Sequence, residues 1–263
     1  MSGSDQLSGL DAIELRPALQ QPGCPVCHAR HRSASRYIDS LLWENVNDVT
    51  TRVLFIRSLG FCPEHTWQAH RSEIERFGDE MGLSIIYEDL TRHVIARLYG
   101  LEAEMSANAV RRSGSAGSFL RNLLRVALGR PSRLSLGRIE PQEECRVCHF
   151  ARQGEERAIR ALAQAVCQPD FRALYVASDG LCLPHLRRAI GETAKDHGEV
   201  AHFLVADAVE RLSRLRSDLH EYTRKRSWQY HHEALTGDQL NAAARASQFF
   251  AGCDRCQGRT EPQ

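Results

Sequence analysis

The sequence predicts an all-α protein made of duplicated helical units, and three observations lead to this prediction. Apolar residues recur three and four positions apart over several segments, which is the spacing of one helix face. No segment shows a sustained alternation of apolar and polar residues, the pattern of a half-buried strand. Two copies of one cysteine–histidine arrangement lie about 120 residues apart. We therefore expect two related helical units, each joined by a metal site.

The first predicted unit spans residues 1–105 and opens with a short leader over residues 1–22. A helix is expected after Cys27, because apolar residues recur along one face of it. A second, short helix follows Asn47 or Asp48, since either side chain can cap its N-terminus. The apolar residues of these two helices are Ala34, Tyr37, Ile38, Leu41, Leu42, Val53, Leu54 and Ile56.

The same unit continues with two more expected helices. Gly60 occupies the position that glycine favours after a helix C-terminus. Cys62 follows, and Pro63 is placed to begin a third helix, because proline is favoured in the first helical turn. A longer fourth helix is expected over residues 80–105. Its predicted buried face consists of Leu83, Ile86, Leu90, Val94 and Leu98.

The second predicted unit, residues 143–226, repeats this order of elements. A helix is expected after Cys148, and a second helix ends at Gly180, two positions before Cys182. The same glycine–x–cysteine pair in both halves favours duplication over chance. A long helix is expected over residues 197–225. The candidate core residues are Ile159, Leu162, Val166, Phe203, Leu204, Val209, Leu212 and Leu215.

Two further regions differ from the repeats. Residues 106–142 form a basic linker with a short amphipathic stretch, which either packs on its own protein or docks on an anionic surface or a partner. Its arginines are Arg111, Arg112, Arg121, Arg125, Arg130, Arg133 and Arg138. Residues 227–263 are expected to form a C-terminal helix followed by a Cys-x2-Cys pair, Cys253 and Cys256.

The repeated motifs use six of the nine cysteines and have the spacing of metal ligands. In each half, a Cys-x2-Cys pair is followed after 35 or 34 positions by a Cys-x2-His pair. We expect the two pairs of each half to close one four-ligand site. The predicted ligands are Cys24, Cys27, Cys62 and His65 for the first site, and Cys145, Cys148, Cys182 and His185 for the second.

Three cysteines and one histidine are a standard set for structural zinc, and a closed set leaves no ligand position for a substrate. The cysteines lie near expected helix N-termini, where free N–H groups favour the thiolate form. We therefore expect two Zn²⁺ ions per chain. An iron–sulfur cluster remains an alternative, because the same ligands can bind iron, and so does thiol–disulfide chemistry without a metal.

Each cysteine pair is followed by a histidine, His28 or His149, and so also matches C-x-x-C-H, the c-type haem attachment pattern. No export signal precedes the motifs, and haem would leave Cys62 and Cys182 unexplained. The two histidines are expected instead at helix starts or as hydrogen-bond donors to a ligand sulfur.

The tail pair has two interpretations. Cys253 and Cys256 either form a third metal site with His231, His232 or Glu233, or remain a solvent-exposed pair of thiols. Cys167 is expected to be a small buried residue.

An aromatic and basic patch lies near residues 222–230, where Tyr222, Trp228 and Tyr230 accompany Arg224 and its neighbours. It either stacks on nucleic acid or is a solvated helix end.

The strings Cys24-Pro-Val-Cys27 and Gly60-Phe-Cys62-Pro-Glu-His65, the stretch 37–48 between them, and the corresponding motifs of the second half resemble an uncharacterised bacterial family. That family has paired CPxC and GxCxxH motifs, a basic central linker and a late CxxC pair. The resemblance covers most of the chain and implies metal binding at the eight positions, but it brings no known activity. The chain departs from the family where Cys253-Asp-Arg replaces Cys-Pro-x.

Composition leaves the function class open. The net charge of +1 does not indicate a nucleic-acid or membrane partner, and no stretch reaches the roughly 20 apolar residues that span a bilayer. The N-terminus has no secretory signal, so a cytoplasmic location is expected. No catalytic motif is recognised. We expect partner binding in assembly, maturation or regulation. The alternatives are a redox or electron-transfer protein, a metal-dependent enzyme and a nucleic-acid-binding protein.

Overall fold

The computed structural model describes residues 9–113, 136–194 and 197–253, and no strand occurs within these ranges. The all-α prediction is therefore confirmed. The chain forms two compact units. The inner unit comprises Ser35–His149, and the terminal unit combines the chain up to Ala34 with the chain from Phe150 onward. This grouping differs from the consecutive units that the sequence predicts. No helix in the described ranges is long and apolar enough to cross a membrane.

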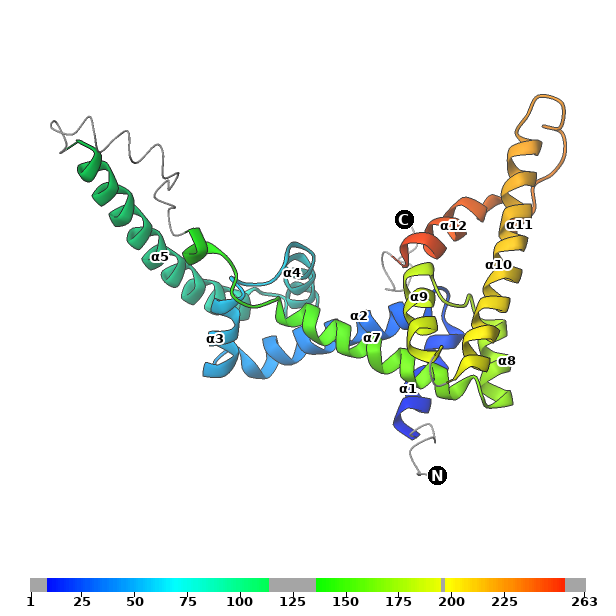
Figure 1. Cartoon of the computed structure of the whole chain (residues 1–263), viewed down its shortest axis with the longest axis horizontal. Helices are drawn as coiled ribbons and strands as arrows, with labels where there is room; N and C mark the ends of the chain where they lie inside the picture. Colours follow the sequence, from blue (N-terminus) through cyan, green and yellow to red (C-terminus); the bar gives the residue numbers. More distant parts are fainter. Residues whose placement is uncertain (1–8, 114–135, 195–196, 254–263) are drawn as a thin grey trace, which may run out of the picture. The chain divides into compact units, whose positions relative to one another are not determined.

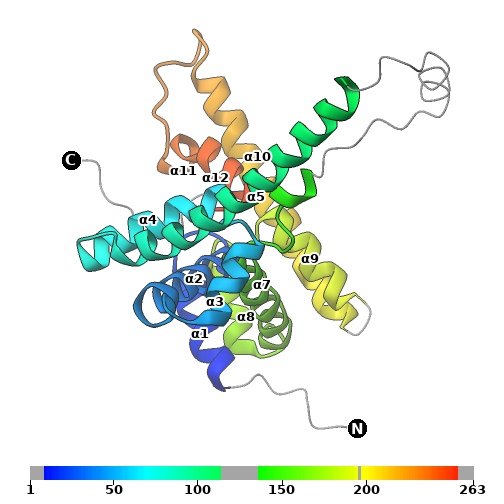
Figure 2. The same cartoon turned by 90° about the vertical axis from the view of Figure 1, so that its left-hand side faces the viewer.

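The inner unit is built around α5, against which α3, α4 and two short helices pack (Figure 2). Its elements are the end of α2 (Pro25–Ser40), the π-helix η1 (Leu41–Asn45), α3 (Val49–Arg57), α4 (Pro63–Phe77), α5 (Met81–Ser113), the 3₁₀ helix η2 (Leu136–Ile139) and the start of α7 (Arg146–Ala165).

Local sequence explains where α3 and α4 begin. Asp48 caps α3, because its carboxylate accepts a hydrogen bond from the backbone N–H of Thr51 at 2.6 Å. Gly60 follows α3 with a φ of 90°, a conformation that favours glycine. Cys62 is the N-cap of α4, and Pro63 opens the helix. The predictions for Asp48 and Pro63 are confirmed. Leu59, with a φ of 52°, occupies the position directly after the C-cap Ser58, so Gly60 lies one residue later than predicted.

The fourth predicted helix exists as α5, but it extends to Ser113, well beyond the predicted end at residue 105. Its start is fixed by Glu73 of α4, a buried carboxylate that accepts hydrogen bonds from the backbone N–H groups of Gly82 and Leu83. The expected burial of Leu98 is wrong, since 46% of that residue is exposed. Leu98 therefore lies on the exposed face of α5, whereas Leu101 one turn later is buried.

The terminal unit contains eight helical segments, most of which pack around one apolar core (Figure 1). They are α1 (Gly9–Gln20), the start of α2, the larger part of α7, α8 (Pro169–Ala177), α9 (Leu183–Thr193), α10 (Gly198–Lys225), and the pair α11 (Gly237–Leu240) and α12 (Ala242–Ala251). The expected leader is in fact the helix α1, because Leu15 and Leu19 join this core. Val209, expected in the core, is exposed.

Two helices of the terminal unit approach closely at a glycine. A Cβ atom at Gly154 of α7 would lie 2.0 Å from Ser33 Oγ and 3.1 Å from the carbonyl oxygen of Ala29, both on α2. Only a residue without a side chain fits this contact. Gly154 is therefore required for the packing of α2 on α7.

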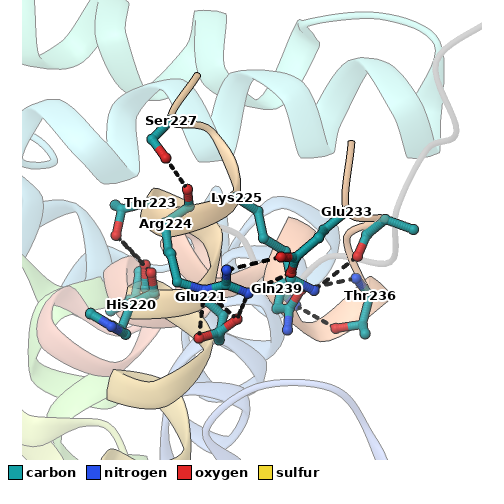
Figure 3. A network of polar contacts seen from close by, with 11 residues as sticks. His220, Glu221, Thr223, Arg224, Lys225, Ser227, Glu233, Thr236 and Gln239 are labelled. Carbon is teal, nitrogen blue, oxygen red and sulfur yellow. Dashed lines mark hydrogen bonds and ion pairs between the residues drawn. The ribbon is translucent and has the colours of Figure 1, made fainter. Parts of the chain in front are cut away.

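A polar network closes the loop between α10 and α11 (Figure 3). The guanidinium of Arg224 donates hydrogen bonds to the carboxylates of both Glu221 and Glu233. Lys225 donates to Gln239, whose side chain takes part in the capping box of α11 with Thr236. These bonds hold the loop after α10 so that α11 and α12 return along α10, with which both are in contact.

Candidate metal centres

The eight cysteine and histidine residues singled out from the sequence form two four-residue groups, and either group could hold a metal ion. Centre A consists of Cys24, Cys27, Cys182 and His185, and lies in the terminal unit. Centre B consists of Cys62, His65, Cys145 and Cys148, and lies in the inner unit. Within each group all ligand atoms lie within 4.8 Å of one another.

The predicted grouping of the ligands is corrected by these contacts. Each Cys-x2-Cys pair meets the Cys-x2-His pair of the other half of the chain, not the one 34 or 35 positions downstream. Centre A joins positions 155 residues apart, Cys27 and Cys182, and centre B joins Cys62 and Cys148, which are 86 residues apart. The entropic cost of closing a loop rises only slowly with the length of the loop. A short distance along the sequence was therefore weak evidence that two ligand pairs bind the same ion.

Centre A is compact and buried in the core of the terminal unit. The Nδ1 atom of His185 lies 3.4 Å from the sulfur atoms of both Cys24 and Cys27, and 3.1 Å from that of Cys182. The sulfur atoms of Cys27 and Cys182 are 3.8 Å apart. All four donor atoms therefore face one common point.

Centre B has the same arrangement in the inner unit. The Nδ1 atom of His65 lies 3.1 Å from Cys62 Sγ, 3.2 Å from Cys148 Sγ and 3.8 Å from Cys145 Sγ. Cys62 and Cys148 Sγ are 3.6 Å apart. In both centres the histidine presents the same ring nitrogen to the sulfurs.

Helix N-termini supply the ligands of both centres. Cys24 directly precedes α2, and Cys182 is the N-cap of α9. In the same way Cys145 directly precedes α7, and Cys62 is the N-cap of α4. The remaining ligand of each pair lies one turn further into its helix. The unpaired N–H groups at these ends stabilise negative sulfur, which suits thiolate ligands of a cation.

Glu155 of α7, which the sequence analysis did not single out, orients the histidine of centre A. Its Oε1 atom lies 3.0 Å from Nε2 of His185, and Arg188 pairs with the same carboxylate. Burial acts to raise the pKa of Glu155, but the hydrogen bond and charge of His185 and the charge of Arg188 outweigh it and lower that pKa. The ionised carboxylate accepts a hydrogen bond from Nε2–H, and this orientation directs Nδ1 of His185 toward the sulfur atoms as the metal-binding nitrogen.

The acid–base state of the ligands differs within centre A. Burial raises the pKa of the Cys24 thiol well above its usual range, whereas hydrogen bonds from Cys24 and Cys27 lower the pKa of Cys182. Burial opposes the charged form of His185, but hydrogen bonds with Cys182 and Cys27 outweigh it and raise its pKa to about 11. The metal-free centre therefore holds protons that a cation must displace.

In centre B, the pKa of the Cys148 thiol is also raised above its usual range. Burial and the hydrogen bond with Cys62 raise the pKa of its thiol to about 12. Uptake of a cation at centre B therefore also releases protons.

Cys253 lies beside centre A. Its sulfur accepts a hydrogen bond from the backbone N–H of Cys24 at 3.3 Å, and its side chain forms a hydrogen bond with Cys27. The other half of the tail pair, Cys256, lies outside the described residues. Among the described residues, His231, His232 and Glu233 join no metal-binding group. No sequence signal related Cys253 to Cys24, since 229 positions separate them.

The other candidate residues have ordinary structural environments. His28 interacts through Nε2 with the backbone oxygen of Pro22, and His149 through Nδ1 with the carboxylate of Glu144. Cys167 is exposed, so its expected burial is wrong. Residues 114–135 of the basic linker lie outside the described residues.

The aromatic and basic patch presents less free charge than its sequence indicates. Arg224 is paired with two carboxylates, Glu221 and Glu233, and stacks over the ring of Tyr230. The guanidinium of Arg226 lies over the ring of Tyr222. The two carboxylates offset the charge of Arg224, whereas Arg226 keeps its charge over a neutral ring.

A family model described as "Family of unknown function (DUF6062)" matches residues 9–256. The chain is also 25% identical over 230 residues to the "Uncharacterized 23.9 kDa protein in xynA 3'region" of Caldicellulosiruptor sp. (strain Rt8B.4). That alignment covers 87% of this chain and 95% of the relative. No solved structure matches the chain.

Proposed function

We propose that this chain, which belongs to the family of unknown function DUF6062, is a zinc protein with two structural metal centres that acts by binding a protein partner. The observation that carries the proposal is the presence of two complete Cys₃His sets, each closed by segments distant in the sequence. The ligands assigned to the two ions are the eight residues of centres A and B.

The distances within both centres support a single ion and not a cluster. With Zn–S bonds of about 2.3 Å, the sulfur atoms of a regular tetrahedron lie about 3.8 Å apart. The sulfur atoms of Cys27 and Cys182 in centre A are 3.8 Å apart, and those of Cys62 and Cys148 in centre B are 3.6 Å apart. An iron–sulfur cluster holds its protein ligands on different iron atoms, which spreads the sulfurs further apart. The geometry therefore favours one tetrahedral ion over the cluster alternative.

Closed ligand sets support a structural role over a catalytic one. A catalytic zinc ion keeps one position for water or substrate, whereas each centre here offers four protein ligands. The four ligands of centre A are also buried in the terminal unit. Such an ion has no room to bind a substrate without losing a protein ligand.

Each ion would hold its unit together, because each centre joins ligands that are far apart in the sequence. The terminal unit joins the chain up to Ala34 to the chain from Phe150, and centre A lies across that joint. Centre B joins the start of α7 to α4 within the inner unit. The binding free energy of a structural ion is then available as folding free energy, which reaches on the order of 10 kcal/mol for zinc in small domains.

Exposed tryptophans support the proposal of a protein partner. Trp43, Trp67 and Trp228, all the tryptophans of the chain, have 72%, 62% and 84% of their surface exposed. Trp43 stacks on Phe77 at 5.5 Å between ring centroids, beside an open hollow of about 560 Å³. Tryptophan is enriched among the residues that dominate protein interfaces, and exposed apolar surface of this kind is typical of binding sites.

Metal analysis of the protein purified without oxygen tests the metal part of the proposal. We expect about two zinc ions per chain and a colourless solution, and removal of the metal with a chelator should abolish much of the far-UV circular dichroism of the helices. Iron with absorbance near 400 nm would support the iron–sulfur alternative. A metal-free protein with an unchanged spectrum would overturn the proposal.

A comparison of tryptophan variants tests the partner part. Crosslinking in cells of the source organism should yield a defined protein partner with the wild-type chain. Trp43→Ala should lose that partner, and Ile13→Ala, at another exposed apolar residue, should retain it. Retention of the same partner by Trp43→Ala would contradict the proposal.

A further inference from the structure

Centre A has a fifth sulfur beside it, whereas centre B has no spare cysteine in its unit. Cys253 follows α12 and packs against the core cluster that contains Cys24, Cys27 and Cys182. The inner unit, Ser35–His149, contains no cysteine besides the three ligands of centre B. The two centres therefore share one ligand pattern but differ in the donors that surround them.

The chain is built to bring the tail against this centre. Gly252 has a φ of 85°, and a Cβ atom there would lie 3.3 Å from Cys27 Sγ and 3.7 Å from Cys182 Sγ. Gly23 has a φ of 98°, and a Cβ atom there would lie 2.5 Å from Cys253 Sγ. Gly252 thus lets the tail backbone approach the sulfur atoms of Cys27 and Cys182. Gly23, just before α2, leaves room for the sulfur of Cys253.

Cys253 is adjacent to the four ligands and is not one of them. It does not belong to the group whose donor atoms all lie within 4.8 Å of one another. Its sulfur is held on the Cys24 and Cys27 side by the hydrogen bonds described above. Since a tetrahedral ion has four positions, this thiol can bind only when another ligand leaves.

We propose that Cys253 is a reserve ligand of centre A, which replaces His185 and completes a four-cysteine set with Cys24, Cys27 and Cys182. Cysteine is a softer ligand than imidazole, so the exchange favours soft, thiolate-preferring cations. Centre A then holds an ion in two ligand states, whereas centre B holds it in one. This inference rests on the proposed function, because it requires an ion at centre A.

Cobalt substitution tests the inference, because the absorption spectrum of tetrahedral Co²⁺ reports how many sulfurs bind the ion. Cys256 is changed to serine in every variant so that one tail thiol is present. His185→Ala should keep two Co²⁺ ions per chain, with the thiolate charge-transfer band strengthened by one additional sulfur. His65→Ala, the matched change at centre B, should keep one. Adding Cys253→Ser to His185→Ala should remove the ion from centre A.

Cadmium provides a readout in which all four ligands of centre A are intact. In the ¹¹³Cd spectrum each additional thiolate ligand moves the resonance downfield. We expect two resonances from the protein with only Cys256→Ser, the one of centre A further downfield, and Cys253→Ser should shift it toward that of centre B. If His185→Ala does not fold, the cadmium spectrum still tests whether Cys253 binds the ion of centre A.

Loss of the centre A ion from His185→Ala while that variant keeps its helical circular dichroism, or a cadmium spectrum unchanged by Cys253→Ser, would overturn the inference. Either result leaves the proposed function intact as long as the wild-type chain binds two ions. Fewer than two ions in the wild-type chain would instead refute the proposed function.

Discussion

The contact between α2 and α7 gives the sharpest prediction about stability. Gly154→Ala would place a methyl group 2.0 Å from Ser33 Oγ and 2.6 Å from Ser33 Cβ, where ordinary contacts exceed 3.4 Å. The serine side chain is short, and the backbone oxygen of Ala29 is only 3.1 Å from the added carbon, so the helices must move apart. Overpacking of this kind costs about 1–3 kcal/mol. The better helix propensity of alanine recovers up to about 1 kcal/mol.

Gly191→Ala is the matched control, because Gly191 also lies inside a helix, α9, but has nothing within 4 Å of a Cβ atom. That variant should gain about 1 kcal/mol from helix propensity alone. The two alanine variants should therefore differ by about 1–3 kcal/mol in free energy of unfolding. Thermal unfolding of the zinc-loaded proteins should place Gly154→Ala roughly 2–12 °C below Gly191→Ala. A Gly154→Ala protein as stable as the control would refute the packing argument.

Two other contacts predict measurable effects. Glu155→Ala should weaken zinc binding at centre A by about 10–100-fold in chelator competition, because His185 loses the group that orients it, while centre B keeps its affinity. Glu156→Ala, which removes only a 3.7 Å pair with Arg188, is its control, and equal affinities for the two variants would contradict the role of Glu155. Glu73→Ala should lower the free energy of unfolding by about 1–3 kcal/mol in urea titration, since two backbone N–H groups at the start of α5 lose their acceptor. The exposed neighbour Glu75→Ala should change it little, and an equal loss in both variants would rule out the capping role.

Most of the helices were predictable from the sequence because they are specified locally. Asp48 caps α3, and Pro63 opens α4, through contacts within a few residues of each helix start. The predictions were wrong where contacts between segments distant in the sequence determine the structure. The start of the chain looked like a leader, but α1 is held by Leu15 and Leu19 in a core made largely by the second half of the chain. Leu98 of α5 is exposed although Leu101, three residues further on, is buried, so periodicity assigned Leu98 to the wrong face of the helix.

The candidate ligands were all predictable, but their partners were not. The motifs identify which side chains can bind a cation, because the Cys-x2-Cys and Cys-x2-His spacings place two donors on one helix turn. Nothing in the spacing states which pair meets which, and duplicated halves make both pairings chemically equivalent. Tertiary packing determines which pairs share an ion. It also places Glu155 beside His185 and Cys253 beside Cys24, and no local sequence motif predicts either contact.

Zinc retention by two combined variants tests the pairing of the centres most directly. Cys27→Ser with Cys182→Ser removes two ligands from centre A and should leave one ion per chain, bound at centre B with the affinity of the wild-type protein. Cys27→Ser with Cys62→Ser, made together with Cys253→Ser to exclude the reserve ligand, removes one ligand from each centre, so no ion should be held with wild-type affinity in chelator competition. The opposite result, one tightly held ion in the second variant and none in the first, would contradict the crossed pairing and restore pairing within each half.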